Sequence, residues 1–208
     1  MKKEDLSNKF ELFEVKPNPE QKLDFVKIFG NNNPVHLEIG SGRGEFLLSK
    51  AMQNPDINYL AIELKEKRIK TILRQLDEEI HKNVKLIRLF VDEAVIGIIP
   101  QASLSMIYII HPDPWPKKKH NRRRLIQQRF IDVLWQLLAS NGKIFLSTDH
   151  SDYAAWIVDH FNRRNDFISI HEKGFSRTAP EDHIETHFEK MKKEEGFPPY
   201  FMAYRKKN

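Results

Sequence analysis

Short apolar runs alternate with stretches of helical spacing, and this alternation constrains the fold more than any other feature of the chain. The runs typical of buried strands are residues 35–39, 58–62, 84–90, 105–110 and 143–148. Helical patterns lie between them at residues 45–52, 64–80, 93–99 and 125–139, and we expect Asn141-Gly142 to end the last one. A helix between two strands gives a right-handed crossover and parallel pairing. The sequence therefore predicts a doubly wound α/β sheet.

The remaining segments extend this prediction. A further helix is expected near residues 152–163, and later strands near 167–171 and 200–205, with an antiparallel C-terminal strand in a mostly parallel sheet. Residues 1–33 are polar and charged, and we expect a loose segment there with one short helix near residues 20–29. Residues 34–208 would form one Rossmann-like domain. In such sheets ligands bind beyond the carboxyl ends of the strands, so the loops after the strands form the expected site.

Composition limits the available chemistry. The chain of 208 residues has no cysteine, which excludes disulfides, thiolate nucleophiles and cysteine metal sites. Its nine histidines are scattered along the chain, and we predict no metal. A charged N-terminus and the absence of any apolar run near ~20 residues predict a cytoplasmic protein with no membrane segment. The net charge of +5 is only a weak sign of a nucleic-acid partner.

A glycine-rich turn follows the first predicted strand. It reads Gly40-Ser41-Gly42-Arg43-Gly44, and we expect Gly40 and Gly42 to border a cofactor, because glycines permit a tight turn and close approach of a ligand. Glu63 ends the second predicted strand, where a carboxylate can accept hydrogen bonds from both hydroxyls of a ribose. Together these features predict a nucleotide-like cofactor, although an ordinary strand-to-helix turn would also use such glycines.

The spacing and charge of this loop favour one class of cofactor. A dinucleotide site has the pattern G-x-G-x-x-G, whereas this loop has G-x-G-x-G. Glu38 and Glu45 flank the loop and would repel a pyrophosphate, but they suit a cofactor that carries an ammonium and a sulfonium. The loop resembles the first motif of class I methyltransferases. That resemblance implies S-adenosylmethionine as cofactor, with Glu38 near its methionine part and Glu63 on its ribose.

The fourth predicted strand runs into a proline-rich loop and then into a basic run. The loop is residues 112–116, Pro-Asp-Pro-Trp-Pro, and its prolines predict an extended backbone that holds Asp113 and Trp115 rigidly. Trp115 could stack on a base or form a pocket wall. Lysine and arginine fill six of the eight positions 117–124. Single lysines there could be solvated, but the whole run predicts a track for a phosphate backbone. Its expected backbone contacts are Arg122, Arg123 and Arg124.

The Asp-Pro-Trp-Pro-Lys sequence and the basic residues after it resemble the signature of the bacterial tRNA (guanine-N7)-methyltransferases. Two further matches are Thr148-Asp149 and Thr186-His187-Phe188-Glu189, and the resemblance covers about residues 35–205. It implies methylation of guanine N7 in the tRNA variable loop. We expect a monomer or a homodimer, and the sequence does not decide between them. The residues that the resemblance places at the cofactor are Glu38, Glu63, Asp92 and Asp113, with Asp113 as the catalytic residue. Those it places at the substrate are Lys117, Asp149, Thr186, His187, Phe188 and Glu189.

Some assignments have alternatives. Asp92 could cap the helix that follows it instead of, or as well as, flanking an adenine. Ile110-His111 stands where the family usually has Asn-Phe, and the segment before Thr186 is unusually acidic. A non-catalytic RNA-binding subunit with a relic pocket, or a methyltransferase for another substrate, would also fit part of the pattern. The retained acids Glu38, Glu63 and Asp113 favour the enzyme.

The expected chemistry needs no general base. Guanine N7 has a free lone pair and no proton, so it can attack an activated methyl group directly, and we expect no such role for His111. Methylation leaves the purine cationic, and carboxylates that accept from its N1–H and N2–H₂ groups would favour that charge. Asp113, Asp149 and Glu189 are the candidates for these contacts.

Overall fold

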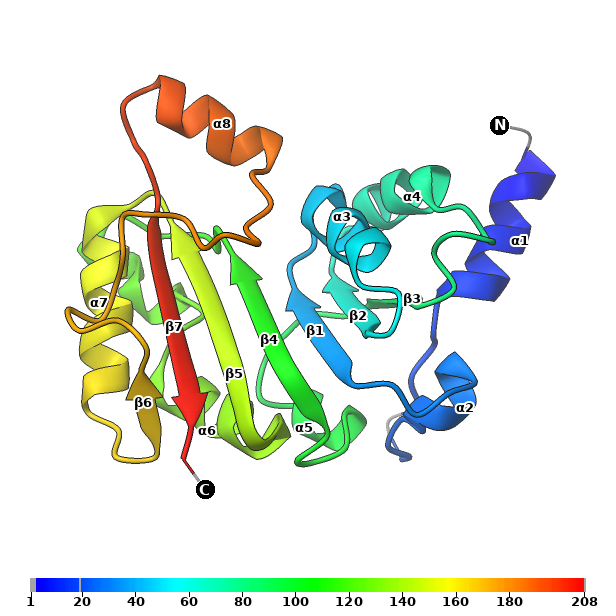
Figure 1. Cartoon of the computed structure of the whole chain (residues 1–208), viewed down its shortest axis with the longest axis horizontal. Coiled ribbons are helices and arrows are strands. Elements are labelled where there is room, and N and C mark those ends of the chain that lie inside the picture. The colour runs from blue at the N-terminus through cyan, green and yellow to red at the C-terminus, as the bar shows by residue number, and fades with distance from the viewer. Residues whose placement is uncertain (1–2, 19, 208) are drawn as a thin grey trace. The chain divides into compact units, whose positions relative to one another are not determined.

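The computed structural model describes residues 3–18 and 20–207 (Figure 1). The chain divides into two compact units, Met1–Pro100 and Gln101–Asn208. Both units combine helices with strands, so the α/β class is confirmed. The expected domain boundary at residue 33 stays a prediction. None of the described helices is long and apolar enough to cross a membrane.

The first unit is built on three parallel strands in the order β3-β2-β1. Its elements are α1 (Lys3–Phe13), α2 (Phe25–Phe29), β1 (Val35–Ile39), α3 (Glu45–Gln53), β2 (Asn58–Glu63), α4 (Glu66–Gln75), β3 (Val84–Arg88) and α5 (Val95–Ile98). Every residue of β2 is buried, as expected for a central parallel strand covered on both faces. Because β1 and β2 run parallel in register, Ile39 lies beside Ile62, and the acid that ends β2 lies next to the turn that follows β1.

The N-terminal segment is more ordered than the sequence predicts. The expectation of a loose segment is wrong for residues 3–18, where α1 packs against α4 and β3. Phe13 is buried, and the Val15 N–H donates to the Leu86 carbonyl over 2.8 Å. A buried aromatic and a backbone bond to β3 hold the segment despite its polar composition. The expected short helix is α2, capped by Asp24, whose side chain accepts from the Lys27 N–H.

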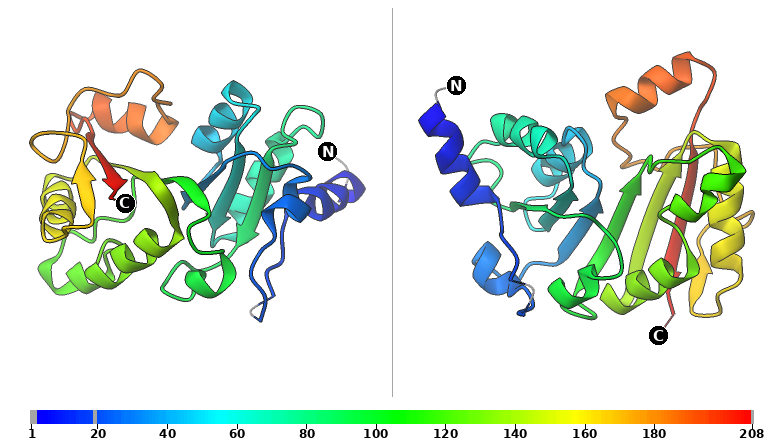
Figure 2. Two further views of the ribbon diagram at one scale, coloured as in Figure 1. Left: turned by 60° about the horizontal axis from the view of Figure 1, so that its bottom comes forward. Right: turned by 180° about the vertical axis from the view of Figure 1, so that it is seen from behind.

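The second unit contains four strands in the order β4-β5-β7-β6. Its elements are β4 (Leu104–Ile110), the 3-10 helix η1 (Lys118–Arg123), α6 (Gln128–Leu137), β5 (Leu138–Thr148), α7 (Ser151–Asn162), β6 (Phe167–Ser169), α8 (His187–Glu194) and β7 (Tyr200–Lys206). The pair β4 and β5 is parallel, whereas β7 is antiparallel to both β5 and β6, which confirms the expected antiparallel C-terminal strand. Figures 1 and 2 show α8 at the end toward which β4 and β5 point.

Two helix ends differ from the sequence prediction. The helix α4 stops at Gln75 because the Asp77 side chain accepts from the Glu79 and Ile80 N–H groups and forms a turn in place of further helix. The prediction that Asn141-Gly142 ends α6 is wrong. That helix ends at Leu137, and residues 139–142 form an irregularity inside β5, where the pairing shifts between Leu104 and Met106.

Besides α1, the helices η1 and α8 were not predicted from the sequence. The helix α8 carries a signal that could have located it, because Thr186 is its N-cap and accepts from the Glu189 N–H over 3.2 Å. A threonine followed three positions later by glutamate is half of a capping box. The helix is mostly polar, so apolar residues at helical spacing do not indicate it.

Candidate functional site

The glycine turn in the first unit has the backbone that the sequence predicts. Gly40, Gly42 and Gly44 all have positive φ, at 82°, 57° and 83°. Only glycine adopts such angles readily. At Gly44 a side chain is excluded on a second ground, since a Cβ there would lie 2.9 Å from Ile72 Cγ1. The turn therefore depends on its glycines, and α3 can begin at Glu45 directly after it.

Glu63 joins the glycine turn to the end of β2. One carboxylate oxygen accepts from the Gly42 N–H over 3.0 Å, and the other accepts from the Lys65 N–H over 2.9 Å. The Arg68 guanidinium lies 3.5 Å from the first of these oxygens. Because each carboxylate oxygen has a second lone pair, Glu63 can hold the turn and still accept from hydroxyl groups of a ligand.

Glu38 is the most perturbed acid of the first unit. It is buried in β1, and its Oε2 atom has no hydrogen-bond partner among the described residues. Burial, and then the nearby charge of Glu63, raise the pKa of the Glu38 carboxyl to about 8. A buried acid with an unsatisfied oxygen is suited to receive a cation. The residues that could hold a positively charged cofactor group are therefore Glu38 and, beside it, Glu63.

Asp92 occupies the turn that leads into α5. Its Oδ1 atom accepts from the Ala94 N–H over 2.8 Å, and its carbonyl accepts from the Val95 N–H over 3.3 Å. These contacts form a turn before the helix, but the alternative of Asp92 as helix N-cap is wrong, because α5 begins at Val95 with Ala94 as its N-cap and no side chain caps it. The contact with an adenine stays a prediction.

The proline-rich loop of the second unit is not simply extended. Two non-glycine residues are in the left-handed region, namely His111 directly before the loop with φ 48° and Trp115 within it with φ 44°. This conformation is uncommon for residues with a side chain. Arg124, which lies after the loop in the sequence, donates from Nε to the Pro114 carbonyl over 2.8 Å and holds the loop in this conformation. The expectation of an extended backbone is thus wrong at Trp115, and Asp113 is exposed at the tip of the loop.

The basic run divides into exposed and buried cations. Lysines 117–119 and Arg122 are exposed on or beside η1. Arg123 is also exposed, with its guanidinium 4.9 Å from the centre of the Trp115 ring. Arg124 is different. It is buried, and its guanidinium lies 5.1 Å and 5.0 Å from the Tyr153 and Trp156 ring centres. The prediction that Arg124 contacts RNA does not fit this structure, because its side chain is buried.

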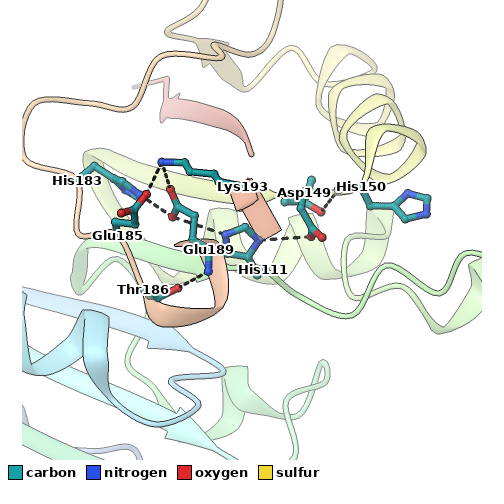
Figure 3. Close-up of polar contacts among 9 residues, drawn as sticks. His111, Asp149, His150, His183, Glu185, Thr186, Glu189 and Lys193 are labelled. Carbon is teal, nitrogen blue, oxygen red and sulfur yellow. Dashed lines mark hydrogen bonds and ion pairs between the residues drawn. The ribbon is translucent and has the colours of Figure 1, made fainter. Parts of the chain in front are cut away.

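A buried cluster of acids and histidines joins the ends of β4 and β5 to α8 (Figure 3). The His111 imidazole lies between two carboxylates, with Nδ1 3.5 Å from Asp149 Oδ1 and Nε2 3.7 Å from Glu189 Oε2. The Glu189 side chain has no solvent exposure, whereas that of Asp149 is 20% exposed. Only Asp149 of these two acids is open to a substrate, so the expected contact between Glu189 and guanine does not fit this conformation.

Glu189 has further partners inside α8 and the segment before it. The His183 Nε2 atom lies 2.7 Å from Glu189 Oε2, and the Lys193 ammonium lies 3.1 Å from Oε1. Burial alone would raise the pKa of Glu189, but the contacts with His111, His183 and Lys193 outweigh it and hold the pKa below its usual range. Glu189 is therefore ionised, and its contacts hold residues 186–189 in place. The sequence offered no signal for His183 or Lys193.

The substrate residues expected from the resemblance fall into three environments. Thr186 caps α8 and is half-buried, and His187 and Phe188 are exposed on its first turn. Lys117 is exposed directly after the proline-rich loop, Asp149 lies half-buried after β5, and Glu189 is buried. The expected catalytic residue, Asp113, is exposed within the loop. The described residues hold no group of three or more histidines and acids arranged to bind a metal ion.

Comparison with known proteins supports one family. Residues 32–201 match a family described as a putative methyltransferase. The tRNA (guanine-N(7)-)-methyltransferase of Listeria monocytogenes is 34% identical over 186 residues, which covers 88% of this chain and 86% of that protein. The enzyme of the same name from Lactobacillus helveticus is 37% identical over 191 residues, with the same coverage of both chains.

Solved structures support the fold. The aminoglycoside resistance methyltransferase NpmB1 superposes with a TM-score of 0.59 at 12% identity, covering 92% of this chain and 95% of that one. The precorrin-6y C5,15-methyltransferase of Geobacter metallireducens has a TM-score of 0.55 at 16% identity, covering 98% of this chain and 86% of that one. These likenesses confirm the Rossmann-like methyltransferase fold. With relatives similar along most of their length, this chain belongs to the family of the bacterial tRNA (guanine-N7)-methyltransferases.

Proposed function

We propose that this protein transfers the methyl group of S-adenosylmethionine to N7 of a guanine in the variable loop of tRNA, giving 7-methylguanosine. The observation that carries the proposal is the acid-lined glycine turn. Glu38 is buried with an unsatisfied oxygen, and Glu63 holds the turn at Gly42. Such a site repels phosphates and receives a cation. The names of the relatives supply the substrate.

The residues of the first unit fit this cofactor. Glu38 would receive the ammonium of the methionine part, because its buried oxygen lacks a partner among the described residues. Glu63 would accept the ribose hydroxyls with its remaining lone pairs. When bound, the cofactor supplies an electrophilic methyl group on a sulfonium. The positive φ angles at Gly40 and Gly42 keep the turn free of side chains where the ligand would approach.

The substrate side relies on position and charge. Guanine N7 needs no base, so alignment supplies most of the rate, roughly 7–11 kcal/mol in well-oriented reactions. We assign Asp113 as the catalytic residue, since its exposed carboxylate sits on a loop fixed by prolines and by Arg124. Asp149, partly exposed, is the second acid placed to accept from the guanine N1–H and N2–H₂ groups. Adenine has no donor at N1, so these acids would also select guanine.

The exposed cations of the basic run would bind the RNA backbone. Lys117, Arg122 and Arg123 are exposed and close in sequence to Asp113, so phosphate contacts there would present the guanine beside the catalytic acid. Arg123 against the Trp115 ring forms a flat cationic surface of the kind that RNA bases stack on. A cytoplasmic location and a monomer or homodimer remain predictions.

Calorimetry tests the cofactor assignment. S-adenosylmethionine or its demethylated product should bind, and NAD should bind far more weakly. Glu63→Ala should weaken the cofactor by about 1–3 kcal/mol, because it removes charged hydrogen bonds to the ribose. Glu63→Gln is the matched control: it keeps one acceptor oxygen and the side-chain volume, so its effect should be smaller. Tight NAD binding by the native protein would overturn the assignment.

A further inference from the structure

His111 occupies an unusual position for a histidine that the chemistry does not require. It directly follows β4, and its side chain is only 6% exposed. Its ring lies between Asp149, which follows β5, and Glu189, on the first turn of α8 (Figure 3). The ring also meets the Phe188 ring edge-on, with 5.1 Å between centres. One imidazole thus contacts two segments that are far apart in the sequence.

The charges around His111 favour its protonated form. Burial alone would lower the pKa of the imidazole, but Asp149 and Glu189 outweigh burial and raise the pKa above its ordinary value. Other charged groups face these two acids. Lys192 lies on the side of Asp149, while His183 and Lys193 contact Glu189. Even with these groups nearby, the two carboxylates that face His111 directly keep its pKa above the ordinary value.

The backbone supports a specific orientation of this ring. His111 has a φ of 48°, and its N–H donates to the Ser147 carbonyl over 3.0 Å. Left-handed backbone is unfavourable for a residue with a side chain, because its Cβ approaches the following carbonyl oxygen. Such strain persists only where the surrounding structure enforces it, and it is concentrated at functional sites.

We propose that His111 is a positioning residue: as an imidazolium it ties the Asp149 carboxylate to Glu189, and so orients Asp149 and holds the Thr186–Glu189 segment at the substrate side. The inference rests on the proposed function for its effect on catalysis, but the tie itself is a property of the protein alone. In this proposal the buried Glu189 pairs with His111 and does not contact the substrate.

The tie has a defined pH dependence. Because the folded-state pKa of His111 lies above its unfolded value, the tie is fully present at pH below the ordinary histidine pKa of about 6.5. It disappears as the pH rises through the folded-state pKa. At high pH the neutral ring no longer balances two carboxylates, so the Thr186–Glu189 segment should loosen.

Nuclear magnetic resonance tests the tie without any enzyme assay. In the native protein labelled with ¹⁵N and ¹³C, the assigned His111 ring should titrate above pH 6.5, with both nitrogens protonated below that point. Asp149→Asn should lower this midpoint, because it removes one of the two carboxylates. A His111 ring that is neutral at pH 6.5 would overturn the proposal, whether or not the protein methylates tRNA.

Kinetics test the consequence. His111→Phe keeps a ring against Phe188 but cannot carry a charge. The ratio of native to variant kcat/KM for tRNA should fall on the order of tenfold between pH 6 and pH 9, as expected when the charge that pairs with two neighbouring carboxylates is lost. The change should appear mainly in KM. A purely packing role predicts a ratio that does not vary with pH. His171→Gln, which removes a histidine outside the cluster, is the control and should follow the native profile.

Discussion

Glu38 offers a quantitative test of the cofactor site. Its carboxyl has a pKa of about 8, so at pH 6 only about 1% of the protein carries the anion that we expect to receive the cofactor ammonium. The apparent Kd increases in proportion as the binding-competent fraction falls. At pH 8 about half of the protein is competent. The cofactor should therefore bind roughly 50-fold more weakly at pH 6 than at pH 8, which corresponds to about 2.3 kcal/mol.

Isothermal titration calorimetry with the demethylated cofactor measures this directly. Titrations in buffers with different ionisation enthalpies should also show release of a proton on binding below pH 8. Glu38→Gln cannot ionise, so it should bind weakly with little change between pH 6 and pH 8. Glu78→Gln removes an exposed carboxylate of the same unit and should follow the native profile. A native affinity that is flat between pH 6 and pH 8 would refute the assignment of Glu38 to the ammonium.

The remaining predictions concern catalysis, RNA binding and the fold. Asp113→Ala should reduce turnover by at least 100-fold, an effect on the scale of removing a transition-state interaction, while tRNA affinity in a filter-binding assay changes little; turnover at the native rate would mean that the acid is structural. Replacing Arg122 and Arg123 by alanine should flatten the slope of log affinity against log salt by roughly 0.7–0.9 for each phosphate that is no longer neutralised. Arg124→Ala should instead lower the free energy of unfolding by about 1–3 kcal/mol, measured in urea, with no change in the salt slope; the reverse pattern would restore Arg124 to the RNA surface. Gly44→Ala should destabilise the fold by a similar ~1–3 kcal/mol, because its positive φ is strained for alanine.

The strands and the cofactor turn could be predicted because their signals are local. The strand predicted at residues 35–39 has the same bounds as the observed β1. Gly40 and Gly42 have backbone angles that follow from their residue type. Glu63 reaches the turn because neighbouring parallel strands end at the same edge, which is a consequence of topology alone.

The rest depends on contacts between distant residues. Arg124 looks like its neighbours in sequence, yet the turn of η1 directs it inward onto Tyr153 and Trp156. The burial of Glu189 results from packing against His111 and His183, which no local pattern announces. The helix α1 was missed for the same reason, since its order derives from contacts with β3 and α4.

The central claim is methylation of guanine N7 in tRNA, and nucleoside mass spectrometry tests it most directly. Unmodified tRNA would be incubated with the protein and S-adenosylmethionine, then digested to nucleosides and mapped by fragment. We predict 7-methylguanosine in the variable loop with the native protein and almost none with Asp113→Ala. A digest without 7-methylguanosine, or with the methyl group on another atom or base, would contradict the claim.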